Sequence, residues 1–364
     1  MNLLFVNQKL GYQSTTTYSY ELARALLARG HKLKLCTVGG ELREWFEEGG
    51  IEILPVKFNF FSFRRLLKFL AEYDPDLIHI QNLRSLPLGQ RLSERLNRPH
   101  LVTVHHVPRG LSAELPHFLL TAVVAVNEDI RESLVNDHHI NKDLIRVVPP
   151  GIHLQRFQPQ AAPAERLPRQ IPVIGTIGRL DPLKGFHYFL SAARKILDRG
   201  WEAMFVIVGE GEEEGQLRQE AKELRIEKNV TFAPPMPDIV DLYRGFDVVV
   251  VPTQRGGVGL AALEAMAVAK PVVGSKVGEM LNVVLDGQTG LLVPEGDADQ
   301  LAGAVIRLLE DPELARRMGA AGRKRVEEQY GLASMVGATE SLYREILEEV
   351  ENQGDTSFRK TPRR

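Results

Sequence analysis

The chain has 364 residues, of which 44% are hydrophobic and 25% are charged, the composition of an ordinary soluble globular protein. These values exclude a collagen-like, wholly disordered or multi-span membrane chain. Lysine and arginine total 45 against 47 aspartate and glutamate, so the net charge is −2, which argues against a dedicated nucleic-acid-binding protein. The length corresponds to about two domains of roughly 150 residues.

The single cysteine, Cys36, rules out an intrachain disulfide and a cysteine-rich metal cluster. A reducing cytoplasm is therefore the expected location. No apolar run approaches the roughly 18 to 20 residues that span a bilayer. The apolar run 3–6 is too short for a signal peptide and is better interpreted as a first buried strand.

Short β-branched apolar runs alternate with segments of helical period, which predicts parallel sheets joined by crossover helices. The first series of predicted strands covers residues 3–6, 32–38, 77–80, 101–104, 122–126 and 145–148. The second series covers residues 173–177, 204–208, 230–232, 248–251, 271–273 and 291–293. This alternation predicts an α/β protein with two doubly wound domains that face a central cleft.

The domain boundaries are predicted from shifts in composition. An N-terminal domain is expected over residues 1–155, a proline-bearing linker over 156–170 and a second domain over 171–330. Residues 331–352 are expected to form a helix that packs back toward the first domain. Residues 353–364 are expected to be a disordered basic tail.

The loop after the predicted strand 173–177 carries two cations between two glycines. Gly178 and Gly185 bracket Arg179 and Lys184, so the backbone can approach a ligand while the cations neutralise negative charge. Ligands of open parallel sheets bind beyond the carboxyl ends of the strands, and a diphosphate suits this loop. A solvated loop whose cations face water is the alternative.

A second candidate anion site follows the predicted strand 248–251. Glycines stand there at the start of a predicted helix, where backbone N–H groups and the helix dipole attract negative charge. The positions concerned are Gly256, Gly257, Val258, Gly259 and Leu260. Further along this helix, Glu264 either reaches the hydroxyls of a ribose or only complements the helix dipole.

Some further features resemble functional motifs but fit them poorly. The stretch 209–215 has the wrong glycine spacing for a dinucleotide loop, and its glutamates would repel a pyrophosphate. Asp74 and Asp76 precede a predicted strand, which places them at the wrong end of the sheet for a metal site. His105 and His106 follow a strand at the right end, although such a pair is more often structural.

One segment of the first domain interleaves aromatic and basic side chains. From Phe58 to Leu70 the chain holds five of its 15 phenylalanines, and Arg64, Arg65 and Lys68 lie among them. Aromatic and basic residues together suit peripheral contact with an anionic membrane. A normal amphipathic helix that packs on the first sheet is the alternative.

Several stretches of the sequence together resemble glycosyltransferase family 4, whose members have the GT-B fold of two Rossmann-like domains. In the first domain the matching stretches are DPDLIH (74–79), VTVH (102–105), VVAVNE (123–128) and VVPPGI (147–152). In the second domain they are GRL (178–180), KG (184–185), LEAMA (263–267) and DGQTGLLV (286–293). The resemblance covers most of the chain.

This resemblance implies transfer of a sugar from a nucleoside diphosphate sugar of the UDP or GDP type, with retention of anomeric configuration. It implies neither a metal nor another cofactor. Arg179 and Lys184 would grip the diphosphate, Glu264 the ribose and His105 the donor sugar. The acceptor would belong to cell-envelope glycolipid or polysaccharide synthesis.

The sequence departs from the family pattern on the donor-sugar side. The family usually has a second glutamate eight positions before Glu264, and this chain has Gly256 there. Asn282 and His153 likewise replace a glutamate and an aspartate of the pattern. A catalytically impaired protein that binds a nucleotide or a partner is therefore the alternative function, and a sugar-nucleotide epimerase is a weaker third hypothesis.

Overall fold

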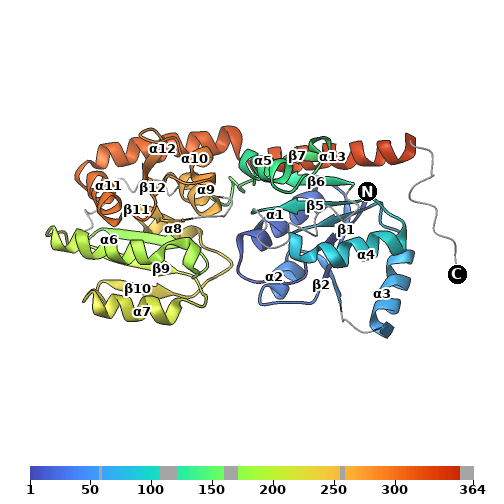
Figure 1. Ribbon diagram of the computed structural model, residues 1–364, viewed down its shortest axis with the longest axis horizontal. Helices are drawn as coiled ribbons and strands as arrows, with labels where there is room; N and C mark the ends of the chain where they lie inside the picture. The colour runs from blue at the N-terminus through green and yellow to red at the C-terminus, as the bar shows by residue number, and fades with distance from the viewer. Residues whose placement is uncertain (57–59, 107–120, 160–170, 255–258, 353–364) are drawn as a thin grey trace. The chain divides into compact units, whose positions relative to one another are not determined.

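The computed structural model describes residues 1–56, 60–106, 121–159, 171–254 and 259–352, and the chain divides into two compact units. The first unit comprises Met1–Gly151 together with the C-terminal helix α13 (Leu332–Asn352), and the second comprises Ile152–Gly331. Both units have the strands and flanking helices that the alternating sequence pattern predicts (Figure 1). Residues 160–170 of the predicted linker and the predicted tail 353–364 lie outside the described residues.

The first unit is built on a seven-stranded parallel sheet with the order β3-β2-β1-β4-β5-β6-β7. Its strands are β1 (Asn2–Val6), β2 (Lys32–Thr37), β3 (Glu52–Pro55), β4 (Leu77–Ile80), β5 (His100–Val104), β6 (Ala122–Ala125) and β7 (Ile145–Val147). The strand order reverses between β1 and β4, where Val6 pairs with Ile80. Strand β3 was not predicted from the sequence, because it is a short strand at the sheet edge with little apolar alternation.

Helices cover both faces of this sheet (Figure 1). They are α1 (Ser14–Ala28), α2 (Arg43–Glu48), α3 (Phe60–Tyr73), α4 (Leu86–Leu96), α5 (Glu128–Asn136) and the 3-10 turns η1 (Leu83–Ser85) and η3 (Lys142–Leu144). Helices α1 and α13 pack on the face that carries Phe5 and Leu77. Helix α4 packs on the other face, since Gly89 lies directly against the Ile80 side chain.

Buried polar contacts attach helix α13 to the first sheet. The Glu340 carboxylate lies 2.6 Å from His31 Nε2 and also binds Arg29. Burial alone would raise the pKa of Glu340, but His31 and Arg29 outweigh it and the pKa is lowered. One turn further on, the Tyr343 hydroxyl lies 2.6 Å from Nδ1 of the fully buried His79. The C-terminal helix is therefore an integral part of the first unit.

The second unit is built on a six-stranded parallel sheet with the order β10-β9-β8-β11-β12-β13. Its strands are β8 (Val173–Ile177), β9 (Met204–Val208), β10 (Val230–Ala233), β11 (Val248–Val251), β12 (Val272–Ser275) and β13 (Gly290–Val293). This is the strand order of a Rossmann fold, and it reverses between β8 and β11. The all-valine strand β11 is buried along its whole length, as a central strand covered on both faces must be.

Two layers of helices enclose the second sheet. The helices are α6 (Phe186–Asp198), α7 (Glu214–Glu223), α8 (Val240–Gly245), α9 (Leu260–Ala267), α10 (Glu279–Val283), α11 (Ala298–Glu310), α12 (Pro312–Gln329) and the 3-10 turn η4 (Pro182–Lys184). One apolar core joins α6, α7 and α11 to the sheet, and another joins α8, α9 and α10 to its opposite face. Among the described residues, no helix has the length and apolar character needed to cross a membrane.

Candidate functional site

The cationic loop predicted from the sequence lies at the reversal point of the second sheet. Gly178 and Arg179 follow β8 directly, and Lys184 is the last residue of η4. The loop after the neighbouring strand β11 begins at Pro252. Open parallel sheets bind their ligands at the carboxyl ends of the strands on either side of such a reversal.

Backbone contacts join the loops after β8 and β11. The N–H of Gln254 donates a 2.9 Å hydrogen bond to the Leu183 carbonyl. Gly185 has a φ of +70°, and a side chain there would collide with the Pro252 carbonyl oxygen. Only glycine satisfies both the left-handed backbone and the close approach. Lys184 is therefore held beside the loop that leads into helix α9.

The two cations of this loop have no acidic partner in the described part of the chain. No carboxylate there lies within ion-pair distance of the exposed Arg179 or the partly buried Lys184. Burial lowers the pKa of Lys184, and the nearby charge of Asp181 only partly opposes this shift. The Asp181 carboxylate itself accepts a 3.0 Å hydrogen bond from the Leu183 N–H. Among the described residues, the loop thus presents positive charge that no ion pair neutralises.

The glycine-rich stretch 209–215 supports this loop from the side. The Leu180 N–H donates a 2.9 Å hydrogen bond to the Glu210 carbonyl. A side chain at Gly209 would collide with the Gly178 carbonyl oxygen. Gly209 and Gly211 are thus accounted for by backbone packing against the cationic loop.

Glu264 lies on helix α9 and is only 5% exposed. The helix begins after Gly259, which has a φ of +63°, and its first residue, Leu260, is half-buried. The Tyr243 hydroxyl donates a 2.8 Å hydrogen bond to Glu264 Oε2. The predicted positions Gly256, Gly257 and Val258 lie outside the described residues.

Tyr243 is a site residue that the sequence analysis did not find. It is fully buried on helix α8, and its ring packs at an angle against Phe246 and Phe157. The Phe246 ring in turn fills the space above Gly175 of β8, where a side chain would collide with it. A tyrosine on an apolar helix face gives no sequence signal of a carboxylate partner 21 residues away.

His105 follows strand β5 in the first unit and is 2% exposed. Its Nε2 lies 3.0 Å from the Gln81 carbonyl oxygen, which can only accept, so Nε2 carries the proton. Burial lowers the pKa of His105 to about 3, and the ring is neutral near pH 7. Its buried Nδ1 is therefore a hydrogen-bond acceptor, and it has no partner among the described residues.

Two further polar groups occupy the reversal point of the first sheet. Asn7 follows β1 and Gln81 follows β4, and both side chains are fully buried. Asn7 Nδ2 and Gln81 Oε1 have no hydrogen-bond partner in the described ranges. Single polar residues after apolar strands are too common to be identified from the sequence, so neither was predicted.

The acidic pair that precedes β4 has structural partners at the amino end of the first sheet. Asp76 Oδ2 accepts a 2.7 Å hydrogen bond from the Asn2 N–H, and Asp74 forms an ion pair with Arg98. These contacts place the pair at the end of the sheet opposite to Asn7 and His105. Across the described ranges, no three acidic, histidine or cysteine side chains are grouped as a metal site requires.

His187 connects helix α6 to the stretch that supports the cationic loop. Its Nε2 lies 3.0 Å from Glu213 Oε1, and its Nδ1 contacts Glu220. Burial lowers the pKa of His187, but the two glutamates outweigh this effect and the net shift is upward. Folding therefore favours the charged form of His187 relative to the unfolded chain.

We predict that His187 makes the stability of the protein depend on pH. The stabilisation by charged His187 is fully present below about pH 6.5, the ordinary pKa of histidine in an unfolded chain. It is lost as the pH rises through the higher pKa of His187 in the folded protein. Relative to the unmodified protein, the His187→Gln variant should have its thermal unfolding midpoint lowered more at pH 5.5 than at pH 8.5. The exposed His139, replaced by Asn, is the control, and an equal loss for His187→Gln at both pH values would contradict the assignment.

A second prediction concerns the hydrogen bond between Tyr243 and Glu264. Tyr243→Phe leaves a buried carboxylate without this donor, which should cost about 1.5–3 kcal/mol of unfolding free energy in urea denaturation. Tyr188→Phe is the matched control, because its half-buried hydroxyl makes no hydrogen bond within the described residues. Similar losses in the two variants would show that Tyr243 stabilises only through its ring.

Comparison with known families gives two adjoining matches. The model described as Glycosyltransferase Family 4 matches residues 15–156, and the model described as Glycosyl transferases group 1 matches residues 158–325. Together they cover both units.

Curated relatives carry glycosyltransferase names. A D-inositol 3-phosphate glycosyltransferase of Saccharomonospora viridis is 32% identical over 304 residues, which are 75% of this chain and 70% of the relative. The enzyme of the same name from Nocardia farcinica is 32% identical over 67% of this chain. The capsular polysaccharide biosynthesis glycosyltransferase CapM of Staphylococcus aureus is 27% identical over 67% of this chain. The chain spans only 61% of the Nocardia relative and 66% of CapM.

Solved structures share the fold at low sequence identity. Anabaena Alr3699/HepE in complex with UDP and glucose has a TM-score of 0.85 at 19% identity, covering 95% of this chain and all of that one. A glycosyltransferase of Rickettsia africae has a TM-score of 0.81 at 20% identity, covering 95% of this chain and 98% of that one. The chain therefore has the GT-B fold and belongs to the glycosyltransferases of group 1 and family 4.

Proposed function

We propose that the protein is a retaining glycosyltransferase that moves a sugar from a UDP- or GDP-type nucleoside diphosphate sugar to an acceptor. The observation that carries the proposal is the partly buried Lys184, which lies at the reversal point of the second sheet without an acidic partner in the described residues. Desolvation of a cation costs free energy unless an anion compensates it. A bound diphosphate supplies that anion.

The relatives support this reaction class and the cellular role that we assign to it. Two of these relatives are 32% and 27% identical to this chain over the aligned residues. They are named D-inositol 3-phosphate glycosyltransferase and capsular polysaccharide biosynthesis glycosyltransferase. The Anabaena structure of the same fold holds UDP and glucose. We assign the acceptor to cell-envelope glycolipid or polysaccharide synthesis.

In the proposed reaction, the bond between the anomeric carbon and the diphosphate oxygen breaks as the acceptor hydroxyl attacks from the same face. The acceptor proton passes to the leaving diphosphate. Arg179 and Lys184 neutralise the charge that develops on this leaving group, an electrostatic contribution that acts mainly in the transition state. We assign this neutralisation to the two side chains and not to a metal ion.

The remaining roles follow from hydrogen-bonding capacity. The Glu264 carboxylate accepts from ribose hydroxyls, while Tyr243 holds one of its oxygens in place. The neutral His105 accepts from a hydroxyl of the donor sugar through Nδ1. The glycines 256, 257 and 259 and the start of helix α9 contribute backbone N–H groups to the diphosphate.

A protein that binds the nucleotide without transferring the sugar is the second candidate function. Gly256 favours it, because the family pattern has a glutamate at that position. The cationic loop and Glu264 do not discriminate between the two functions, since both require nucleotide binding.

We also infer peripheral contact with an anionic membrane through helix α3. The described part of the predicted segment begins at Phe60, so Phe58 lies outside it. Phe61 is 82% exposed, and Arg64, Arg65 and Lys68 are exposed on the same helix. Exposed aromatic and basic side chains are the combination that binds anionic lipid surfaces.

Arg179→Ala should weaken UDP or GDP binding, as measured by isothermal titration calorimetry. The loss of a charge-assisted contact of about 1.5–3 kcal/mol corresponds to a roughly 10- to 150-fold higher Kd. Arg199→Ala, at the opposite end of helix α6, should leave the Kd unchanged. If the unmodified protein binds neither nucleotide, the proposed function is wrong.

Sugar release distinguishes the transferase from the binding protein. The purified protein should hydrolyse its nucleotide-sugar donor slowly in the absence of an acceptor, and Lys184→Ala should abolish this release. Lys195→Ala is the control, because Lys195 is a half-buried lysine of helix α6 that pairs with Asp299. Binding of donor nucleotides without any hydrolysis or transfer would favour the non-catalytic function.

A further inference from the structure

Glu213 contacts the cationic loop of the second unit on both sides of Lys184. Its N–H donates a 3.2 Å hydrogen bond to the carbonyl of Leu180, which precedes Lys184. Its Oε1 lies 3.0 Å from Nε2 of His187, which stands in the first turn of helix α6, three residues after Lys184. One residue therefore connects the two ends of the segment that carries this lysine.

The stretch that contains Glu213 is packed tightly against the loop. The Leu180 N–H donates a 2.9 Å hydrogen bond to the Glu210 carbonyl. At Gly211, a side chain would collide with the Leu180 carbonyl oxygen. Closely packed backbones transmit small shifts, because they leave no free space to absorb them. A displacement of Glu213 would therefore also displace the loop.

His187 lies between two carboxylates. Its Nε2 contacts Glu213, and its Nδ1 contacts Glu220 of helix α7. A charged imidazole has two N–H groups and can donate to both carboxylates, whereas a neutral imidazole has only one. Deprotonation of His187 therefore removes one of the two hydrogen bonds and leaves a nitrogen lone pair facing a carboxylate.

Glu213 depends on the charge of His187 more than an exposed glutamate would. Its side chain is buried, and Oε2 has no hydrogen-bond partner among the described residues. A buried carboxylate is costly unless a positive charge compensates it. Loss of the proton from His187 therefore favours movement of Glu213 toward water.

Other charged groups on the helices that pack against α6 have partners of their own. Asp299 of α11 pairs with Lys195, and Glu214 of α7 pairs with Arg218. Burial lowers the pKa of His187, but Glu213 and Glu220 outweigh this effect. The charge state of His187 is therefore set by the same two carboxylates that it holds.

We propose that His187 and Glu213 are positioning residues for the nucleotide site, and that charged His187 keeps Lys184 in the arrangement that binds a diphosphate. The inference rests on the nucleotide binding proposed above and adds to it a dependence of affinity on pH. Affinity should be higher where His187 is charged. By reciprocity, a bound nucleotide should favour the charged form of His187.

The test measures the Kd of UDP-glucose and GDP-mannose by isothermal titration calorimetry at pH 6.0 and pH 8.5. These diphosphate diesters lack the terminal phosphate whose pKa of about 6 would disturb a comparison with UDP or GDP. The rise in Kd between the two pH values should be about fivefold larger for the unmodified protein than for His187→Gln, a typical coupling between sites. Titration of Lys184 affects both proteins alike, and His139→Asn should behave like the unmodified protein.

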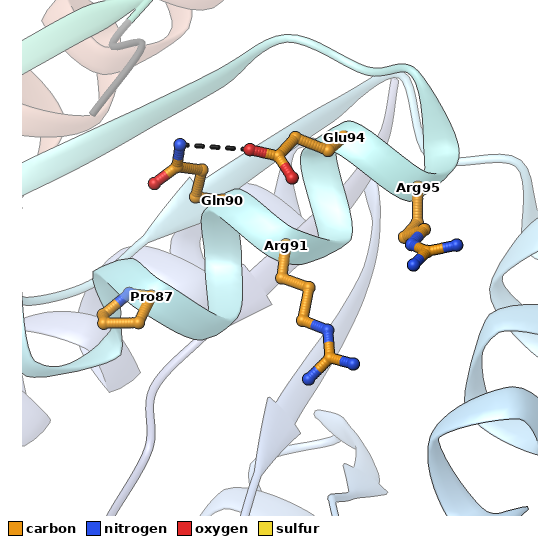
Figure 2. Close-up of a pocket in the computed structure, with 5 residues that line it drawn as sticks. All are labelled: Pro87, Gln90, Arg91, Glu94 and Arg95. Carbon is orange, nitrogen blue, oxygen red and sulfur yellow. Dashed lines mark hydrogen bonds between the residues drawn. The ribbon is translucent and has the colours of Figure 1, made fainter. Parts of the chain in front are cut away.

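A second set of variants tests the connection through Glu213. Glu213→Gln should lose the same fivefold difference although His187 is present. Glu94→Gln is the control for loss of a glutamate charge, because Glu94 lines a pocket on helix α4 of the first unit, where its Oε1 accepts a 3.1 Å hydrogen bond from Gln90 Nε2 (Figure 2). Glu213→Asp keeps the charge but shortens the side chain, so it should also lose the difference and replaces Glu213→Gln if that variant does not fold.

The outcomes separate this inference from the proposed function. If His187→Gln shows the same rise in Kd as the unmodified protein, the positioning role is wrong while nucleotide binding stands. If the difference survives in the Glu213 variants, it reflects direct attraction between charged His187 and the diphosphate, which also overturns the positioning role. If the unmodified protein binds neither nucleotide sugar at either pH, the proposed function itself is wrong.

Discussion

The close backbone approach between the loops after β8 and β11 is the constraint on which the second unit's site depends. Gly185 touches the Pro252 carbonyl with a left-handed backbone, and Gln254 binds the Leu183 carbonyl. These contacts hold Lys184 where burial lowers its pKa. The partial burial of this charge thus depends on the close approach that Gly185 allows. Burying a charge costs stability, which the backbone contacts must offset.

A second chain of contacts connects the centre of the sheet to Glu264. Gly175 of β8 leaves room for the Phe246 ring, which packs against Tyr243, which in turn binds the Glu264 carboxylate. Tyr243 remains protonated because burial and the neighbouring Glu264 raise its pKa well above the ordinary value. The tyrosine is therefore a permanent donor. Core packing thus contributes to the orientation of this carboxylate through Tyr243.

The sequence predicts the sheets better than the side-chain contacts of the site. Strands such as β6 and β11 are continuous apolar runs, so local hydrophobicity identifies them. The edge strand β3 was not predicted, because Glu52–Pro55 has only one fully buried residue. The position of Arg179 and Lys184 after β8 could be predicted, because the residue types and the preceding strand are both readable from the sequence. Tyr243 was not predicted, because its hydrogen bond to Glu264 depends on tertiary packing between two helices.

The two sheets differ in what their reversal points offer to a ligand. The first has buried, neutral groups at Asn7, Gln81 and His105, and burial keeps the histidine uncharged. The second has two cations. Neutral donors and acceptors match hydroxyl groups without attracting charge, whereas cations match phosphate oxygens at the risk of binding any anion. The cations of the second sheet therefore suit a phosphate-bearing ligand better than the neutral groups of the first sheet do.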